Sequence, residues 1–185
     1  MILKSLYSRL ANFARREDGT LALEAMIVLP AMFWAFLAIF SIFETVRTYD
    51  LAQKAAFTIG DAISRETAPL DNNYMIGMHA LYEYLSQTQG QSAIRVSSLR
   101  WDAGNNRFYS DWSRTQGNAA QLTSEDVRSW STRLPVMPDN ERVMLVETWS
   151  NYDPPFDTGL GQREIRNFVF TRPRFAPRVC WEQCQ

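Results

Sequence analysis

The sequence predicts an α+β protein in which a long N-terminal transmembrane helix is followed by a small α+β domain with an antiparallel sheet. The helix is indicated by an uncharged apolar run over residues 25–43. As a helix this run reaches about 28 Å, close to the ~30 Å hydrocarbon core of a bilayer. The sheet is indicated by alternating apolar and polar residues over 93–101 and 142–152, with turn-forming residues between them.

A basic leader precedes the apolar run and predicts its orientation. Lys4, Arg9, Arg15 and Arg16 outnumber the two acidic residues of the leader, whereas the charges after the run roughly balance. Because a basic excess stays on the cytoplasmic side, we expect the N-terminus inside and the bulk of the chain exported. A secretory signal would have a shorter apolar region followed by a small-x-small cleavage site. We therefore expect the helix to remain in the mature protein as an anchor in contact with membrane lipid.

Glu24 lies directly against the front edge of the apolar run, five residues after Gly19. An ionisable group costs on the order of 2.5–3.5 kcal/mol at the bilayer centre and less near the interface. One interpretation places Glu24 at headgroup level, where it costs little. The other treats Gly19, Thr20 and Glu24 as one motif, in which a basic leader precedes Gly-x-x-x-x-Glu and a run of membrane length follows it.

One helix is predicted from residue 20 to about residue 65, with a bend at Pro30 and an end before Pro69. Beyond the apolar run, small and aliphatic residues recur at three- and four-residue steps on one stripe of this helix. The stripe could pack on the protein's own domain or on neighbouring subunits, and the sequence leaves both interpretations open. Its members are Ala55, Ala56, Ile59, Ala62 and Ile63.

The rest of the chain, residues 66–185, is predicted to form the exported α+β domain. Each of its elements is indicated by a cap, by alternation or by turn-forming residues. The first elements that we expect are a helix from a cap at Asp71 or Asn72 to about Gln87, a turn at 89–91 and a hairpin of strands 93–101 and 107–112. A short helix within 118–133 should follow, with Val127, Trp130 and Leu134 on its apolar side. The chain should end with strands 142–152 and 164–171, joined by a loop at 157–162, and an extended tail from Arg172.

The composition and the motifs argue against an enzyme and against a nucleic-acid-binding protein. The net charge is −1, which gives no electrostatic case for nucleic acid. The chain has no nucleophile motif with a base, no Gly-rich phosphate loop and no metal-ligand spacing. His79 lies in the predicted helix with no metal-ligand or catalytic motif around it, so we interpret it as a surface or packing residue. We expect no catalytic residue, no cofactor and no metal site.

Cys180 and Cys184 lie close to the C-terminus. An oxidising compartment favours a disulfide in an exported domain, and a spacing of four residues can close a small ring. Free thiols, an intermolecular bridge and a metal remain alternatives. Two cysteines and one histidine in the whole chain are a poor ligand set for structural zinc.

The combination of leader, Gly19, Glu24 and apolar run resembles the type IV prepilin signature. With a strand Val-Glu-Thr-Trp-Ser-Asn-Tyr at 146–152 and a closing Arg-Pro-Arg-Phe-Ala-Pro-Arg-Val-Cys-Trp at 172–181, the chain resembles the TadE/TadG-like pseudopilins. These are minor components of the bacterial tight-adherence (Tad, or Flp) pilus system. Residues 15–65 carry the stronger part of the resemblance.

This resemblance implies a pilin-like layout and a structural role in pilus assembly and adhesion. A prepilin peptidase would cut between Gly19 and Thr20, removing residues 1–19, and Glu24 would be the glutamate of the processing motif. The mature protein would reside in the inner membrane with its C-terminal domain in the periplasm. Its partners would be other pilin-like subunits and inner-membrane pilus assembly proteins. Thr20 departs from the Phe or Met common at that site in major type IV pilins, so N-methylation and entry into the filament shaft are not part of the expectation.

Two further hypotheses follow from the sequence. Cleavage would create a cationic amine at Thr20, which could pair with the Glu24 carboxylate of a neighbouring subunit. This pairing would offset the cost of holding either charge in lipid. The alternative to a pseudopilin is a single-span anchored periplasmic binding or sensor module that is never cleaved.

Overall fold

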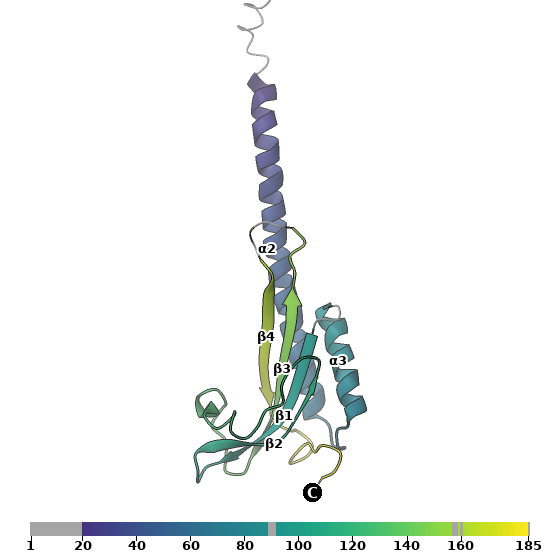
Figure 1. Cartoon of the computed structure of the whole chain (residues 1–185), viewed down its shortest axis with the longest axis vertical. Helices are drawn as coiled ribbons and strands as arrows, with labels where there is room; N and C mark the ends of the chain where they lie inside the picture. Colours follow the sequence, from purple (N-terminus) through teal and green to yellow (C-terminus); the bar gives the residue numbers. More distant parts are fainter. Residues whose placement is uncertain (1–19, 89–91, 157–158, 160, 185) are drawn as a thin grey trace, which may run out of the picture. The chain divides into compact units, whose positions relative to one another are not determined.

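The computed structural model describes residues 20–88, 92–156, 159 and 161–184. Within them, helices α2 (Thr20–Ser64) and α3 (Asn72–Ser86) precede four strands (Figure 1). The chain divides into two compact units between Phe43 and Glu44, so that α2 contributes residues 20–43 to the first unit and 44–64 to the second. The predicted layout of a long N-terminal apolar helix followed by an α+β region is confirmed.

The ends of both helices follow from local chemistry. Helix α2 continues through Pro30 and ends at Ser64, where bonds from Arg65 N to Ala62 O and from Glu66 N to Ile63 O tighten the last turn. In α3, the side chain of Asp71 accepts a 2.7 Å hydrogen bond from Tyr74 N, as a helix N-cap does. The predicted cap at Asp71 is therefore confirmed.

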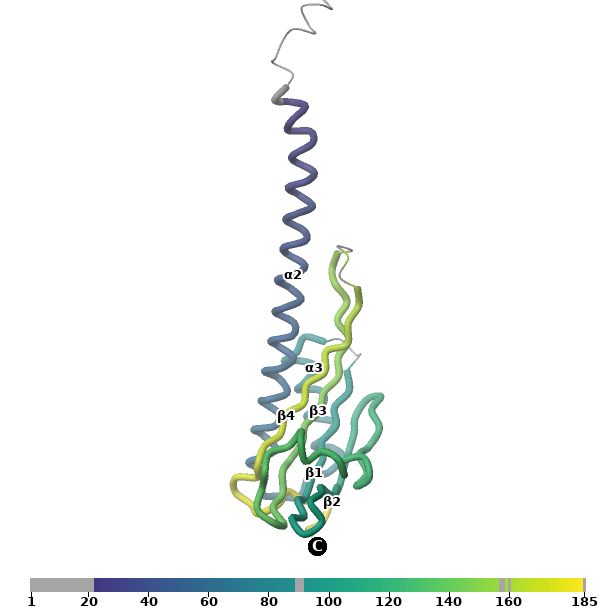
Figure 2. The backbone as a smooth tube through the Cα atoms, turned by 90° about the vertical axis from the view of Figure 1, so that its left-hand side faces the viewer, coloured from purple at the N-terminus to yellow at the C-terminus, as the bar shows by residue number. Residues whose placement is uncertain are grey.

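The strands form one antiparallel sheet in the order β2-β1-β3-β4, as Figure 2 shows. They are β1 (Ser92–Asp102), β2 (Arg107–Gln116), β3 (Arg142–Tyr152) and β4 (Arg163–Thr171). The hairpin β1–β2 is longer than predicted, because β2 continues to Gln116. The pairing of the two strands shifts register between Ser98 and Leu99 of β1. The predicted turn at 89–91 and residues 157, 158 and 160 of the predicted loop lie outside the described residues.

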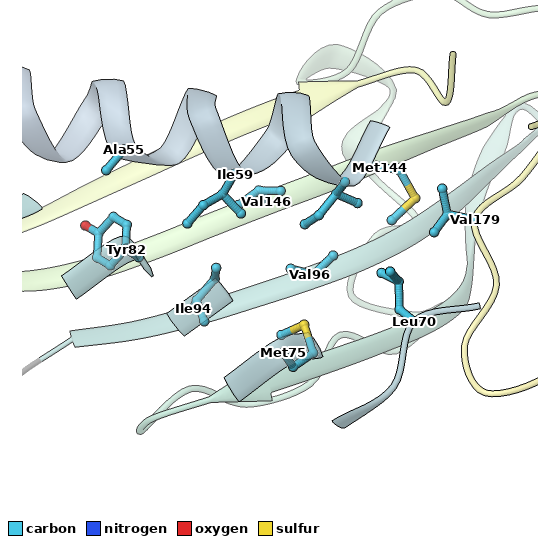
Figure 3. Close-up of a cluster of buried hydrophobic side chains, with 11 residues drawn as sticks. Ala55, Ile59, Leu70, Met75, Tyr82, Ile94, Val96, Met144, Val146 and Val179 are labelled. Carbon is cyan, nitrogen blue, oxygen red and sulfur yellow. The ribbon is translucent and has the colours of Figure 1, made fainter. Parts of the chain in front are cut away.

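Alternation along the strands separates two cores, one on each face of the sheet. On the first face, Ile94 and Val96 of β1 and Met144 and Val146 of β3 are buried beneath side chains from both helices (Figure 3). Side chains within a strand point alternately to opposite faces. The helix-covered cluster consists of Ala55, Ile59, Ile63, Leu70, Met75, Tyr82, Ile94, Val96, Met144, Val146 and Val179.

The second face is covered by the segment between β2 and β3, where the predicted short helix is present only as one 3-10 turn. The segment forms turns and a three-residue 3-10 helix, Trp130–Thr132, although Val127 and Leu134 are buried as expected. Hydrogen bonds to β2, from Leu122 N to Ser113 Oγ and from Ser110 N to Ser124 Oγ, hold the segment along the strand. These tertiary bonds take precedence over local helix propensity.

The C-terminal tail returns to the connection between the two helices. Arg174 N donates to Ser64 O at 2.8 Å, and Leu70 N donates to Cys180 O at 2.9 Å. Leu70 also forms an isolated parallel bridge with Trp181. The tail therefore joins the helix-covered core through Val179, which is 3% exposed.

Candidate functional site

The apolar part of α2 exposes nearly all of its large side chains. This helix is long and apolar enough to cross a membrane, by length and composition, and it is the one such helix in the described part of the chain. Burying apolar surface is worth about 25 cal/mol per Å², so a surface of this kind has a lower free energy against lipid or other protein than in water. The exposed residues are Leu23, Met26, Ile27, Val28, Leu29, Met32, Phe33, Trp34, Phe36, Ile39, Phe40, Ile42 and Phe43.

Glu24 is the single charged residue of α2 between Thr20 and Phe43. Its side chain is exposed, and the first basic residue further along the helix, Arg47, contacts Glu44 at 3.4 Å. Positions 20 and 24 lie one helical turn apart and so share one side of α2. Gly19 and the leader, residues 1–19, lie outside the described residues. A cation for the Glu24 carboxylate is therefore not available from its own helix between Thr20 and Phe43.

Beyond the apolar part, α2 packs on the protein's own sheet. Of the predicted stripe, Ala55, Ala56, Ile59 and Ile63 are buried and Ala62 is half-buried. The interpretation that the stripe packs on the protein's own domain is therefore confirmed.

Gly60 allows this close approach, because a Cβ built on it would lie 3.3 Å from Val169 Cγ1 of β4. On the remaining surface of this part of the helix, Val46 is 63% exposed and Phe57 is 54% exposed.

Cys180 and Cys184 form a disulfide with a Cα–Cα distance of 5.2 Å. The five residues of this ring include Trp181, whose indole lies 5.8 Å from that of Trp112, centroid to centroid. The indole Nε1 of Trp112 donates to Val179 O at 3.0 Å. The disulfide thus closes the segment that contacts both β2 and the connection at Leu70.

A buried ion pair joins β1 and β3 on the sheet face opposite the helices. Arg95 and Glu147 are register partners, and a guanidinium nitrogen of Arg95 lies 2.6 Å from a carboxylate oxygen of Glu147. Burial raises the pKa of the Glu147 carboxyl, and the Arg95 charge opposes this shift. Sequence reasoning missed the pair, although a glutamate in the apolar run of residues 143–149 was a signal for a buried carboxylate that needs a cation.

His79 has contacts that link α3 to β1. Its Nε2 lies 2.9 Å from Ser92 Oγ, and that hydroxyl donates to Glu83 at 2.9 Å. In a catalytic triad the acid would hold the ring nitrogen that does not face the serine. Here Glu83 contacts the hydroxyl itself, so the three side chains form a packing link. Within the described ranges, no group of three or more His, Cys, Asp or Glu residues is placed to hold a metal ion.

Comparison with known proteins does not assign the chain to a family. No family model matches it, and neither a curated protein nor a solved structure is significantly similar to it.

Proposed function

We propose that this chain is a minor pilin-like subunit of a bacterial tight-adherence type IV pilus assembly system. One observation carries the proposal: a membrane-length apolar helix, with a lone glutamate near its start, continues directly into a helix that packs on a four-stranded antiparallel sheet. The resemblance to the TadE/TadG-like pseudopilins, which is stronger over residues 15–65 and is supported by the C-terminal tail, suggests the family.

The chemistry of Glu24 supports the proposal further. A carboxylate at membrane depth is stabilised by a cation, and α2 offers none between Thr20 and Phe43. Cleavage after Gly19 would create an amine one turn before Glu24. In a bundle of parallel helices, the amine of one subunit and the carboxylate of the next would neutralise each other and favour one axial stagger.

The proposed location follows from the same features. The basic leader would keep the N-terminus in the cytoplasm, α2 would anchor the protein in the inner membrane, and the sheet domain would lie in the periplasm. The disulfide between Cys180 and Cys184 suits an oxidising compartment. The role is structural, and the partners are the prepilin peptidase, other pilin-like subunits and membrane assembly proteins.

The test is the intact mass of the full chain produced with and without its prepilin peptidase. We expect loss of residues 1–19 when the peptidase is present. Gly19→Leu should block this loss, whereas Gly77→Leu, a matched change on the open face of α3, should leave it intact. An uncut chain beside a peptidase that cleaves a second prepilin in the same cells would overturn the proposal. The chain would then be an uncleaved anchored binding or sensor module.

A further inference from the structure

A groove of about 460 Å³ lies between the sheet and the C-terminal tail. One wall is formed by Asp111, Trp112 and Arg114 of β2 together with Arg142, the first residue of β3. The other wall is formed by tail residues 178–183. Its size falls within the range of about 300–1,000 Å³ that is typical of ligand pockets.

The tail wall of this groove is held in place on several sides. Leu70 N donates to Cys180 O at 2.9 Å, and Glu182 N donates to Leu70 O at 2.8 Å. The indole of Trp112 donates to Val179 O, and the disulfide closes the ring around Trp181. The groove is therefore formed before any ligand arrives, which lowers the cost of binding.

The charges of the groove do not balance. Asp111 is shared by two guanidinium groups, at 2.7 Å from Arg142 and 3.5 Å from Arg100. In the described part of the chain, neither Arg114 nor Arg178 has a carboxylate within the 4.0 Å of an ion pair. Glu182 is the other acidic residue of the lining, so the groove is lined by three arginines and two carboxylates.

The aromatic side chains orient Arg114, one of the two lining arginines that have no carboxylate partner in the described part of the chain. The guanidinium carbon of Arg114 lies 4.8 Å from the ring centroid of Trp181, which also packs against Trp112. A guanidinium stacked on a ring keeps its N–H edges available for bidentate bonds to an oxyanion. One N–H of Arg114 is used by Ser113 O at 3.0 Å. The Trp181 ring already contacts Arg114 and Trp112, so we do not expect it to stack on a ligand. The guanidinium groups would therefore recognise the ligand.

We propose that this groove binds carboxylates of an acidic polypeptide segment, with Arg114 and Arg178 as the ligating side chains. A planar carboxylate matches the edge of a stacked guanidinium. A groove of about 460 Å³ is much larger than one small oxyanion needs, which favours a peptide over a free anion. This site does not depend on the proposed function, because removal of the leader changes none of its residues.

The experiment is calorimetric titration of the full chain in nonionic detergent with a hexaglutamate peptide and with hexaglutamine. We expect binding of hexaglutamate alone, weakening as salt is added. Arg114→Gln combined with Arg178→Gln should raise the dissociation constant by about tenfold or more. Arg128→Gln is the matched control, since Arg128 is exposed and pairs with Glu125 outside the groove.

A third variant tests the sign of the electrostatic argument. Asp111→Asn releases Arg142 and Arg100 from their carboxylate, so it should tighten hexaglutamate binding. Near-UV circular dichroism of the Trp112–Trp181 pair verifies that each variant keeps the groove. Absence of hexaglutamate binding, or equal binding by the Arg114→Gln/Arg178→Gln protein, would overturn the proposal. Acetate or inorganic phosphate bound as tightly as the peptide would overturn the peptide as ligand.

Discussion

At the scale of single residues, Glu147 and Arg95 show how a charge is kept inside the sheet. Burial raises the pKa of the Glu147 carboxyl from its ordinary value, and the positive charges of Arg95 and Arg133 limit the shift. Because the pKa of Glu147 is higher in the folded state, protonation of this carboxyl stabilises the folded protein. That contribution to the free energy of unfolding is fully present below the ordinary pKa of glutamate and is lost as the pH rises through the raised pKa. The charge of Arg95 stabilises the ionised form of the Glu147 carboxyl.

Arg95→Met should therefore reduce the free energy of unfolding by about 3 kcal/mol at pH 7, because it removes the directly bonded cation of a buried carboxylate and leaves only the weaker influence of Arg133. The penalty should shrink as the pH falls toward the ordinary pKa of glutamate, where Glu147 takes up a proton. Urea unfolding of the full chain in detergent at pH 7 and pH 5 measures both values. Arg95→Met with Glu147→Met should cost less than Arg95→Met alone, and an equal penalty at both pH values would contradict the argument.

At the scale of secondary-structure elements, Gly60 decides how closely α2 approaches β4. A side chain there must displace Val169, whose Cγ1 lies 3.3 Å from the position of a Cβ. We expect Gly60→Leu to destabilise the protein by about 2 kcal/mol through overpacking. Gly77→Leu on α3 meets no atom within 4 Å at its Cβ and should be neutral or stabilising. Thermal unfolding compares the two; equal effects would mean that helix propensity alone decides the result.

The disulfide is the second device at this scale. For a ring of five residues the chain-entropy estimate is about 2 kcal/mol, so Cys180→Ser with Cys184→Ser should lower the free energy of unfolding by that amount. Urea unfolding with and without reductant measures it. Reductant should change the parent protein and leave the double variant unaffected, and an effect of reductant on both would assign the loss to something other than the disulfide.

The elements that could be predicted from sequence are those that depend on neighbours in the chain. The cap at Asp71, the apolar run of α2 and the alternation of residues 142–152 are local signals, and all three match the structure. The contact of Leu70 with Trp181 joins residues far apart in the chain, and no periodic pattern in the sequence predicts it. The segment 118–133 has a local helix signal, but its bonds to β2 are tertiary. The groove was missed for the same reason, because its walls meet only in three dimensions.

At the scale of the whole molecule, the apolar part of α2 should decide whether the protein stays in a membrane. Phe36→Arg places a charge near the middle of the apolar run, where it costs about 2.5–3.5 kcal/mol in lipid. We expect it to increase the fraction released by alkaline carbonate extraction. Phe57→Arg is the matched control, because Phe57 is exposed on α2 beyond that run. Equal release of both variants would mean that the helix does not anchor the chain.

A second prediction for the whole molecule concerns the hypothesis that Glu24 joins one subunit to the next. If the amine created at Thr20 pairs with Glu24 of a neighbour, Glu24→Ala chains that the peptidase has cut should self-associate less than the processed parent protein. We expect chemical crosslinking of processed chains in membranes to fall severalfold. Glu44→Ala is the matched control, since Glu44 lies on α2 after the apolar run and contacts Arg47. Gly19→Leu should reproduce the loss, because an uncut chain has no amine at Thr20. Full crosslinking of Glu24→Ala, or loss with Glu44→Ala as well, would remove Glu24 from the assembly contact.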